Sequence, residues 1–118
     1  MPVRSLNSSV LIWPQRRAVE AAVRELAARL AKAHPGLTRF GVFGSYARGD
    51  WGVGSDVDLI AIVRHSARPF AERPLDFDLS GLPLPADLVV YTEDEWEAMQ
   101  KASNPFARMV VETALWVQ

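Results

Sequence analysis

The first regular pattern along the chain is a stretch of apolar residues at three- and four-residue spacing, which begins after Pro14. Its apolar positions are Ala18, Val19, Ala22, Val23, Leu26, Ala27 and Leu30. Charged residues, namely Arg17, Glu20, Arg24 and Lys32, lie elsewhere in the stretch, so it predicts an amphipathic helix with one apolar face. Proline is tolerated in a first helical turn, and His34-Pro35-Gly36 is a stop signal. We therefore expect a helix between Pro14 and His34.

Three short apolar stretches with the character of β-strands follow this helix. They run from Leu37 to Phe43, from Val57 to Val63 and from Leu88 to Tyr91, and the second is rich in β-branched residues. Residues 46–55 contain three glycines and read as a turn. Residues 64–85 contain four prolines, so we expect an irregular connection with at most a short helix.

The C-terminal part of the chain predicts two helices. Thr92 is followed by three acidic residues, which is typical of an N-cap and first turn, and this helix runs to about Ala102. Asn104-Pro105 begins the final helix. Its apolar side consists of Phe106, Met109, Val110, Thr113, Ala114 and Val117. The element order predicts one α/β (α+β) domain over residues 1–118, with a small mixed β-sheet flanked by helices and a loose lead-in over 1–13.

Composition narrows the class of protein. The chain has 118 residues, of which 49% are hydrophobic and 23% charged, the balance of a soluble globular domain. It contains no cysteine, which excludes disulfides, thiolate nucleophiles and cysteine-ligated metal centres. The net charge of −1 argues against a non-specific nucleic-acid binder, which normally carries a basic excess. The apolar runs are too short for a membrane span or a signal peptide, so we expect a cytoplasmic protein.

The candidate chemistry lies between Gly41 and Asp58, in GVFGSYARGDWGVGSDVD. Asp56 and Asp58 are two residues apart at the start of a strand, so their side chains project to the same face. Two such carboxylates repel each other unless a cation lies between them, and all-oxygen ligands suit magnesium or manganese. Gly44 ends the preceding strand and allows close backbone approach to a ligand, while Ser45 offers a hydroxyl and an N–H to a phosphate.

A second Asp-x-Asp pair, Asp76-Phe77-Asp78, provides a comparison within the same chain. It lies between Pro74 and Gly81, and no β-branched strand follows it. Nothing in the sequence fixes its two carboxylates on one face, so we interpret it as a solvated loop.

The spacing of Gly44-Ser45, ten intervening residues and Asp56-Val57-Asp58 resembles the signature of the DNA polymerase β-type nucleotidyltransferase superfamily. Within it, the small size and the spacing are similar to the minimal nucleotidyltransferase (MNT) branch. The resemblance covers roughly residues 15–117 and implies a polymerase-β-like nucleotidyltransferase fold. It also implies a third carboxylate on a neighbouring strand, for which Asp87 is the candidate. By itself, Asp87 also fits an acid at a strand edge or in a turn.

By this resemblance, Asp56, Asp58 and Asp87 are the catalytic and metal-binding residues, and they hold two Mg²⁺ or Mn²⁺ ions. Gly44, Ser45 and Arg48 are the nucleotide-binding residues, with ATP or another nucleoside triphosphate as substrate. Arg48 fits equally well as a surface residue paired with Asp50. The implied reaction is in-line attack of a hydroxyl on the α-phosphorus, with pyrophosphate as the leaving group.

The resemblance also implies a partner, because MNT proteins are typically encoded beside a helical protein of the HEPN or substrate-binding type. Several are antitoxins that transfer AMP to a tyrosine of a HEPN toxin, and direct binding of nucleic acid is not expected. The final helix, with Trp116 exposed, either docks this partner or simply packs on the sheet. The assembly expected is a homodimer or a hetero-oligomer. Two alternatives stay open: a catalytically silent module that neutralises or scaffolds a helical partner, and one subunit of a small-molecule nucleotidyltransferase.

Overall fold

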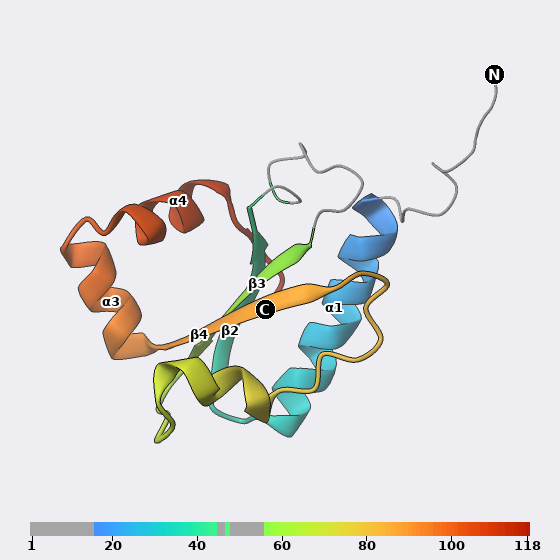
Figure 1. Cartoon of the computed structure of the whole chain (residues 1–118), viewed down its shortest axis with the longest axis horizontal. Helices are drawn as coiled ribbons and strands as arrows, with labels where there is room; N and C mark the ends of the chain where they lie inside the picture. The colour runs from blue at the N-terminus through green and yellow to red at the C-terminus, as the bar shows by residue number, and fades with distance from the viewer. Residues whose placement is uncertain (1–15, 45–46, 48–55) are drawn as a thin grey trace.

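The computed structural model describes residues 16–44, 47 and 56–118, and the predicted lead-in over 1–13 lies outside them. A four-stranded sheet has helices on both faces (Figure 1), as the sequence analysis predicts. Helix α1, Arg16–Ala33, covers one face, and helices α3, Glu93–Lys101, and α4, Pro105–Thr113, cover the other. Within these ranges no helix is both long and apolar enough to cross a membrane.

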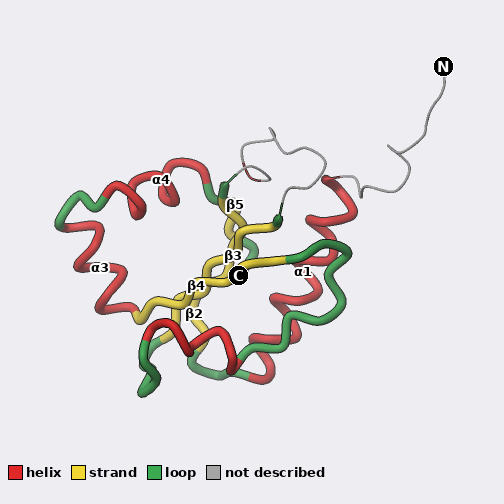
Figure 2. The backbone as a smooth tube through the Cα atoms, in the orientation of Figure 1, coloured by secondary structure: helices red, strands yellow, loops and turns green. Residues whose placement is uncertain are grey.

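The sheet consists of β2 (Leu37–Phe43), β3 (Val57–Val63), β4 (Ala86–Thr92) and β5 (Leu115–Trp116). Their spatial order is β4-β3-β2-β5. Strand β2 runs antiparallel to β3 and to β5, whereas β3 and β4 are parallel. A parallel pair needs a crossover connection, and the long segment between β3 and β4 supplies it (Figure 2).

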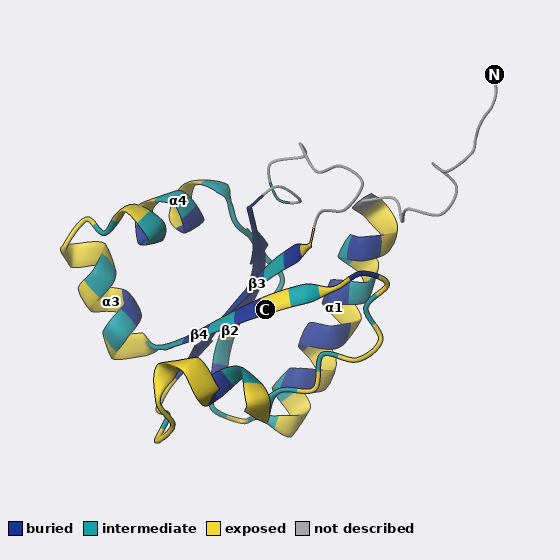
Figure 3. Cartoon of the chain, viewed as in Figure 1, coloured by how far each residue is buried: buried dark blue, intermediate teal, exposed yellow. Residues whose placement is uncertain are grey.

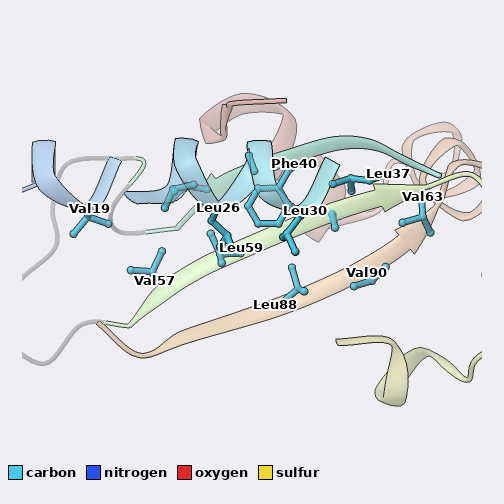
Figure 4. Close-up of a cluster of buried hydrophobic side chains, with 14 of the residues drawn as sticks. Val19, Leu26, Leu30, Leu37, Phe40, Val57, Leu59, Val63, Leu88 and Val90 are labelled. Atoms are coloured by element: carbon cyan, nitrogen blue, oxygen red, sulfur yellow. The ribbon is translucent and has the colours of Figure 1, made fainter. Parts of the chain in front are cut away.

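Two apolar cores pack on opposite faces of the sheet. The α1-side core joins the apolar face of α1 to alternate strand residues and includes Val19, Leu26, Leu30, Phe40, Leu59, Leu88 and Val90 (Figure 4). The α3/α4-side core consists of Phe43, Ile60, Ile62, Trp96, Ala107 and Val110. Buried and exposed positions alternate along α1 (Figure 3), which confirms the amphipathic helix.

The end of the chain departs from the prediction. The helix expected to continue as far as Val117 stops at Thr113, and Ala114 is extended with φ −69° and ψ 146°. Trp116 then pairs with Gly41 of β2, where a Cβ atom at residue 41 would lie only 2.9 Å from Leu115 O. The apolar periodicity continued past Thr113, but edge pairing next to a glycine determined the conformation.

The connection over 64–85 contains one short 3-10 helix, η2, Phe70–Asp76, as its four prolines predict. One residue of η2, Arg73, is buried, with only 7% of its surface exposed.

Helix α3 begins directly after β4 with a capping box. The side chain of Thr92 accepts a hydrogen bond from Glu95 N, and the side chain of Glu95 accepts one from Thr92 N. This capping box confirms Thr92 as the N-cap of α3.

Candidate active site

The three predicted acidic residues lie at the start of β3 and of β4, at one end of the sheet. Asp56 immediately precedes β3 and is exposed, and Asp58 is the second residue of β3 and is half-buried. Asp87 is the second residue of β4 and is exposed. In the parallel β3–β4 pair, Asp58 lies directly opposite Asp87. Neighbouring strands are about 4.8 Å apart, so these two acidic residues are close neighbours across the sheet.

Alternation along the strands assigns both residues to the same face. Ile60 and Ile62 follow Asp58 at two-residue steps and belong to the α3/α4-side core. Val89 and Tyr91 follow Asp87 in the same way and pack against that core. Asp58 and Asp87 therefore both face the side of the sheet that carries α3 and α4. A shared site would be excluded if Asp87 faced α1. The β3–β4 register instead puts Asp87 on the same face as Asp58.

The carboxylates of Asp56, Asp58 and Asp87 would offer a metal ion oxygen ligands only, which fits magnesium or manganese. Neither Asp56 nor Asp87 forms a salt bridge with any residue that the structure describes. Within residues 16–44, 47 and 56–118, however, no three His, Asp or Glu side chains are gathered as a metal-ion site. The backbone thus brings Asp58 and Asp87 together, and the assignment of Asp56, Asp58 and Asp87 as metal ligands stays a prediction.

Gly44 lies beside this end of the sheet, where β2 turns away. Phe43 is the last β2 residue paired with β3, and its partner is Asp58. Gly44 has φ +78°, a left-handed conformation that glycine adopts without steric cost. The other two predicted nucleotide-binding residues, Ser45 and Arg48, lie outside the described residues.

The second Asp-x-Asp pair has local partners of its own. Asp76 Oδ1 accepts from Arg68 Nε at 2.7 Å, and Asp78 Oδ1 accepts from Ser80 N at 3.0 Å. The hydrogen bond from the Ser80 backbone lowers the pKa of Asp78. Asp76 is the last residue of η2, and Asp78 lies in the loop that follows, so the interpretation as a loop holds for Asp78 only.

The opposite end of the sheet contains an ion pair that sequence reasoning missed. Arg73 Nη1 and Nη2 donate to the two carboxylate oxygens of Glu95, at 2.7 and 3.0 Å. Arg73 also donates to the carbonyls of Arg68 and Val90. The guanidinium lowers the pKa of Glu95 to about 2, mainly through its hydrogen bonds to the carboxylate. No sequence signal marks this pair, since Glu95 reads as one of three helix-start acids.

A pocket of about 240 Å³ opens at this opposite end, between the end of α1 and η2. His34 and His65 line it together with Arg73. The His34 ring packs against Phe77 with 4.4 Å between the ring centroids. The pocket is separate from the carboxylates, which lie at the start of β3 and β4.

Comparison with known proteins places this geometry in a family. The family model of the nucleotidyltransferase domain matches residues 23–113, which include Gly44, both carboxylates of the Asp56-Val57-Asp58 motif, and Asp87. The chain belongs to the nucleotidyltransferase domain family. No curated protein sequence matches it.

Two crystal structures with low sequence identity share the nucleotidyltransferase fold. A candidate nucleotidyltransferase from Sulfolobus solfataricus superposes with a TM-score of 0.55 and 22% identity, over 70% of this chain and 75% of that chain. A toxin–antitoxin structure with AMP-PNP superposes with a TM-score of 0.50 and 20% identity, over 80% of this chain and 72% of that chain. At these identities the likeness concerns the fold alone.

Proposed function

We propose that this nucleotidyltransferase domain moves AMP from ATP to a hydroxyl group of a partner protein, as the antitoxin of a HEPN toxin. The observation that carries the proposal is the register that sets Asp58 opposite Asp87 on one face, with Asp56 two residues before Asp58. The family match supports nucleotidyl transfer. The toxin–antitoxin neighbour with AMP-PNP makes a protein partner and an adenine nucleotide the first choices.

Asp56, Asp58 and Asp87 would hold the divalent ions, Mg²⁺ or Mn²⁺. Bound there, an ion supplies positive charge that offsets the charge of the triphosphate. Asp87 is at the exposed start of β4, where its carboxylate can accept the proton of the incoming hydroxyl. Gly44, Ser45 and Arg48 would orient the triphosphate. The hydroxyl oxygen bonds to the α-phosphorus, the bond to the β-phosphate oxygen breaks, and pyrophosphate leaves.

Such a site works mostly by positioning and by neutralising charge. The four-stranded sheet fixes Asp58 and Asp87 through adjacent backbone ladders rather than through loops. With ATP as the donor, we propose that the reaction takes place in the cytoplasm.

Labelled ATP tests the proposal directly. The protein and the product of its neighbouring gene are incubated with magnesium and ATP labelled at either the α- or the γ-phosphate. Label retained on the partner from the α position alone supports nucleotidyl transfer. Label retained from the γ position alone indicates a kinase and refutes the proposal.

Paired variants separate catalysis from simple binding. The double variant Asp56→Asn with Asp58→Asn should lose transfer and lose neutralisation of the partner. Asp78→Asn is the matched control, because Asn can still accept the hydrogen bond from Ser80 N. If the double variant neutralises the partner as well as the wild type does, the chain is a binding module. Label on an added small molecule instead of the partner indicates a small-molecule nucleotidyltransferase.

A further inference from the structure

The space where a side chain of Gly44 would lie is filled by Asp58. A Cβ atom built on Gly44 would lie 2.5 Å from Asp58 Oδ2, 3.4 Å from its Cγ and 3.6 Å from its Cβ. Real Cβ atoms essentially never approach another atom within 3.0 Å. The Cβ, Cγ and Oδ2 atoms of Asp58 therefore lie beside the α-carbon of Gly44, in the space that a Cβ atom would need.

We infer that Gly44 is a positioning residue for the Asp58 carboxylate, in addition to any contact that its backbone makes with a triphosphate. The kinetic consequence rests on the proposed function, whereas the packing itself does not. A glycine at this position is required for two separate reasons: the positive φ and the missing Cβ atom.

The strand ladder fixes the backbone of Asp58, so a side chain at residue 44 would act on the Asp58 carboxylate or on the turn. Asp58 is paired on one side with Phe43 of β2 and on the other with Asp87 of β4. Its backbone is thus fixed between two strands, and a methyl group at residue 44 would be relieved by rotating the carboxylate or by moving the turn. Rotation alters where the carboxylate points relative to Asp87, whereas movement of the turn removes the backbone of residue 44 from its place beside the carboxylate.

Substitutions at two other glycines distinguish the effect of a positive φ from the effect of a clashing Cβ atom. Gly81 also has a positive φ, +96°, but a Cβ atom there would meet nothing closer than Arg29 Nη1 at 3.7 Å. A Cβ atom on Gly36 would meet nothing within 4 Å. Gly81→Ala therefore measures backbone strain without a clash, and Gly36→Ala measures neither.

The first test is a stability cycle that needs no enzymatic activity. Each alanine variant is made in the wild type and in an Asp58→Ala background, and its Tm is measured. We expect Gly44→Ala to lower Tm by about 10 °C in the wild type and by about 5 °C in the Asp58→Ala background. Gly81→Ala should lower it by about 5 °C in both, and Gly36→Ala should change it little in either. Equal losses from Gly44→Ala in the two backgrounds would overturn the inference.

If Gly44→Ala does not fold, Gly44→Asn replaces it in the same cycle. Asparagine tolerates a positive φ better than alanine but still carries a Cβ atom. Its Tm loss should therefore arise from the contact with Asp58 and should largely disappear in the Asp58→Ala background. A loss that persists there contradicts the inference.

The second test separates positioning from phosphate binding. A displaced carboxylate should lower kcat of Gly44→Ala about 100-fold while KM for ATP changes by less than about 2-fold. A raised KM with unchanged kcat would contradict the positioning role. If the wild type transfers no nucleotide, the proposed function fails, and the stability cycle still decides whether Gly44 makes room for Asp58.

Discussion

The two ends of the sheet use charge in opposite ways. At one end, Arg73 and Glu95 form a bidentate ion pair, and Thr92 N donates a further hydrogen bond to the Glu95 carboxylate. At the other end, Asp58 and Asp87 face each other across adjacent strands, with Asp56 close by in the sequence. Removing one partner of a largely buried ion pair destabilises the fold, whereas gathered like charges repel each other and favour a bound cation. The first end is therefore structural, and the second is the candidate for chemistry.

The largest expected effect separates activity from stability at the carboxylate end. Asp87→Asn should reduce nucleotidyl transfer by on the order of 1,000-fold, because it removes one charge from the proposed metal and phosphate site. The free energy of unfolding should stay the same or rise, since Asp87 is exposed and the change removes a like-charge repulsion. Transfer is measured with α-labelled ATP, and unfolding is measured in urea. Asp78→Asn serves as the control, and a large loss of stability in Asp87→Asn would contradict the comparison.

At the ion-pair end, we expect a substitution to lower the stability of the fold. Arg73→Met should lower the free energy of unfolding by about 3 kcal/mol, because it leaves the carbonyls of Arg68 and Val90 without their donor and Glu95 without its partner. Urea denaturation measures this change. Arg68→Met is a matched control, since Arg68 is 45% exposed and its pair with Asp76 is a surface pair worth less than about 1 kcal/mol. Similar losses in the two variants would mean that burial does not distinguish them.

Acid titration isolates Glu95 within the ion pair. Its pKa is lowered from 4.5 to about 2 in the folded protein. A lowered pKa contributes stability that is present above pH 4.5 and is lost as the pH falls towards 2. The free energy of unfolding, measured from pH 7 down to pH 2, should fall less steeply in Glu95→Gln than in the wild type. Because Glu95 is 42% exposed, solvent screening limits its contribution to about 1 kcal/mol. Parallel profiles for the two proteins would contradict this assignment.

The last prediction concerns the stability that a bound magnesium ion adds to the fold. Magnesium at five times its Kd should raise the free energy of unfolding of the wild type by about 1 kcal/mol. A chelator should reverse the gain, and Asp56→Asn should weaken it. Glu93→Gln, at the exposed start of α3, is the control that should keep it. If magnesium stabilises the Asp56→Asn variant as strongly as the wild type, Asp56 is not a ligand.

Sequence patterns predicted the elements whose periodicity is local. The apolar spacing of α1, the β-branched run of β3 and the cap at Thr92 all correspond to observed elements. Alternation along β4 also puts Asp87, Val89 and Tyr91 on one face, whereas the side of the sheet that this face meets came from the packing. These features depend on residues two to four positions apart, so one sequence is enough to find them.

Features that depend on distant contacts were not predictable in this way. Strand β5 exists because Gly41 leaves room for it, 74 residues away from Leu115 in the chain. Arg73 and Glu95 are 22 residues apart, and their pairing follows only from the route of the connection through η2. The contact between Gly44 and Asp58 likewise requires the β2–β3 register. The roles of Ser45 and Arg48 stay predictions, as does the joint role of the three carboxylates.

The hydrogen bonds of Arg73 and Glu95 have a further consequence for how separate molecules meet in solution. Strand β4 is the outermost strand on its side of the sheet, and Pro85 O is directed inwards to Val57 N. In a parallel ladder alternate residues point outwards, so Val90 and Thr92 present their backbone groups to the open side. Arg73 takes the carbonyl of Val90, and Glu95 takes the N–H of Thr92. A foreign strand that tried to extend the sheet there would find these positions already taken, which protects that stretch from aggregation.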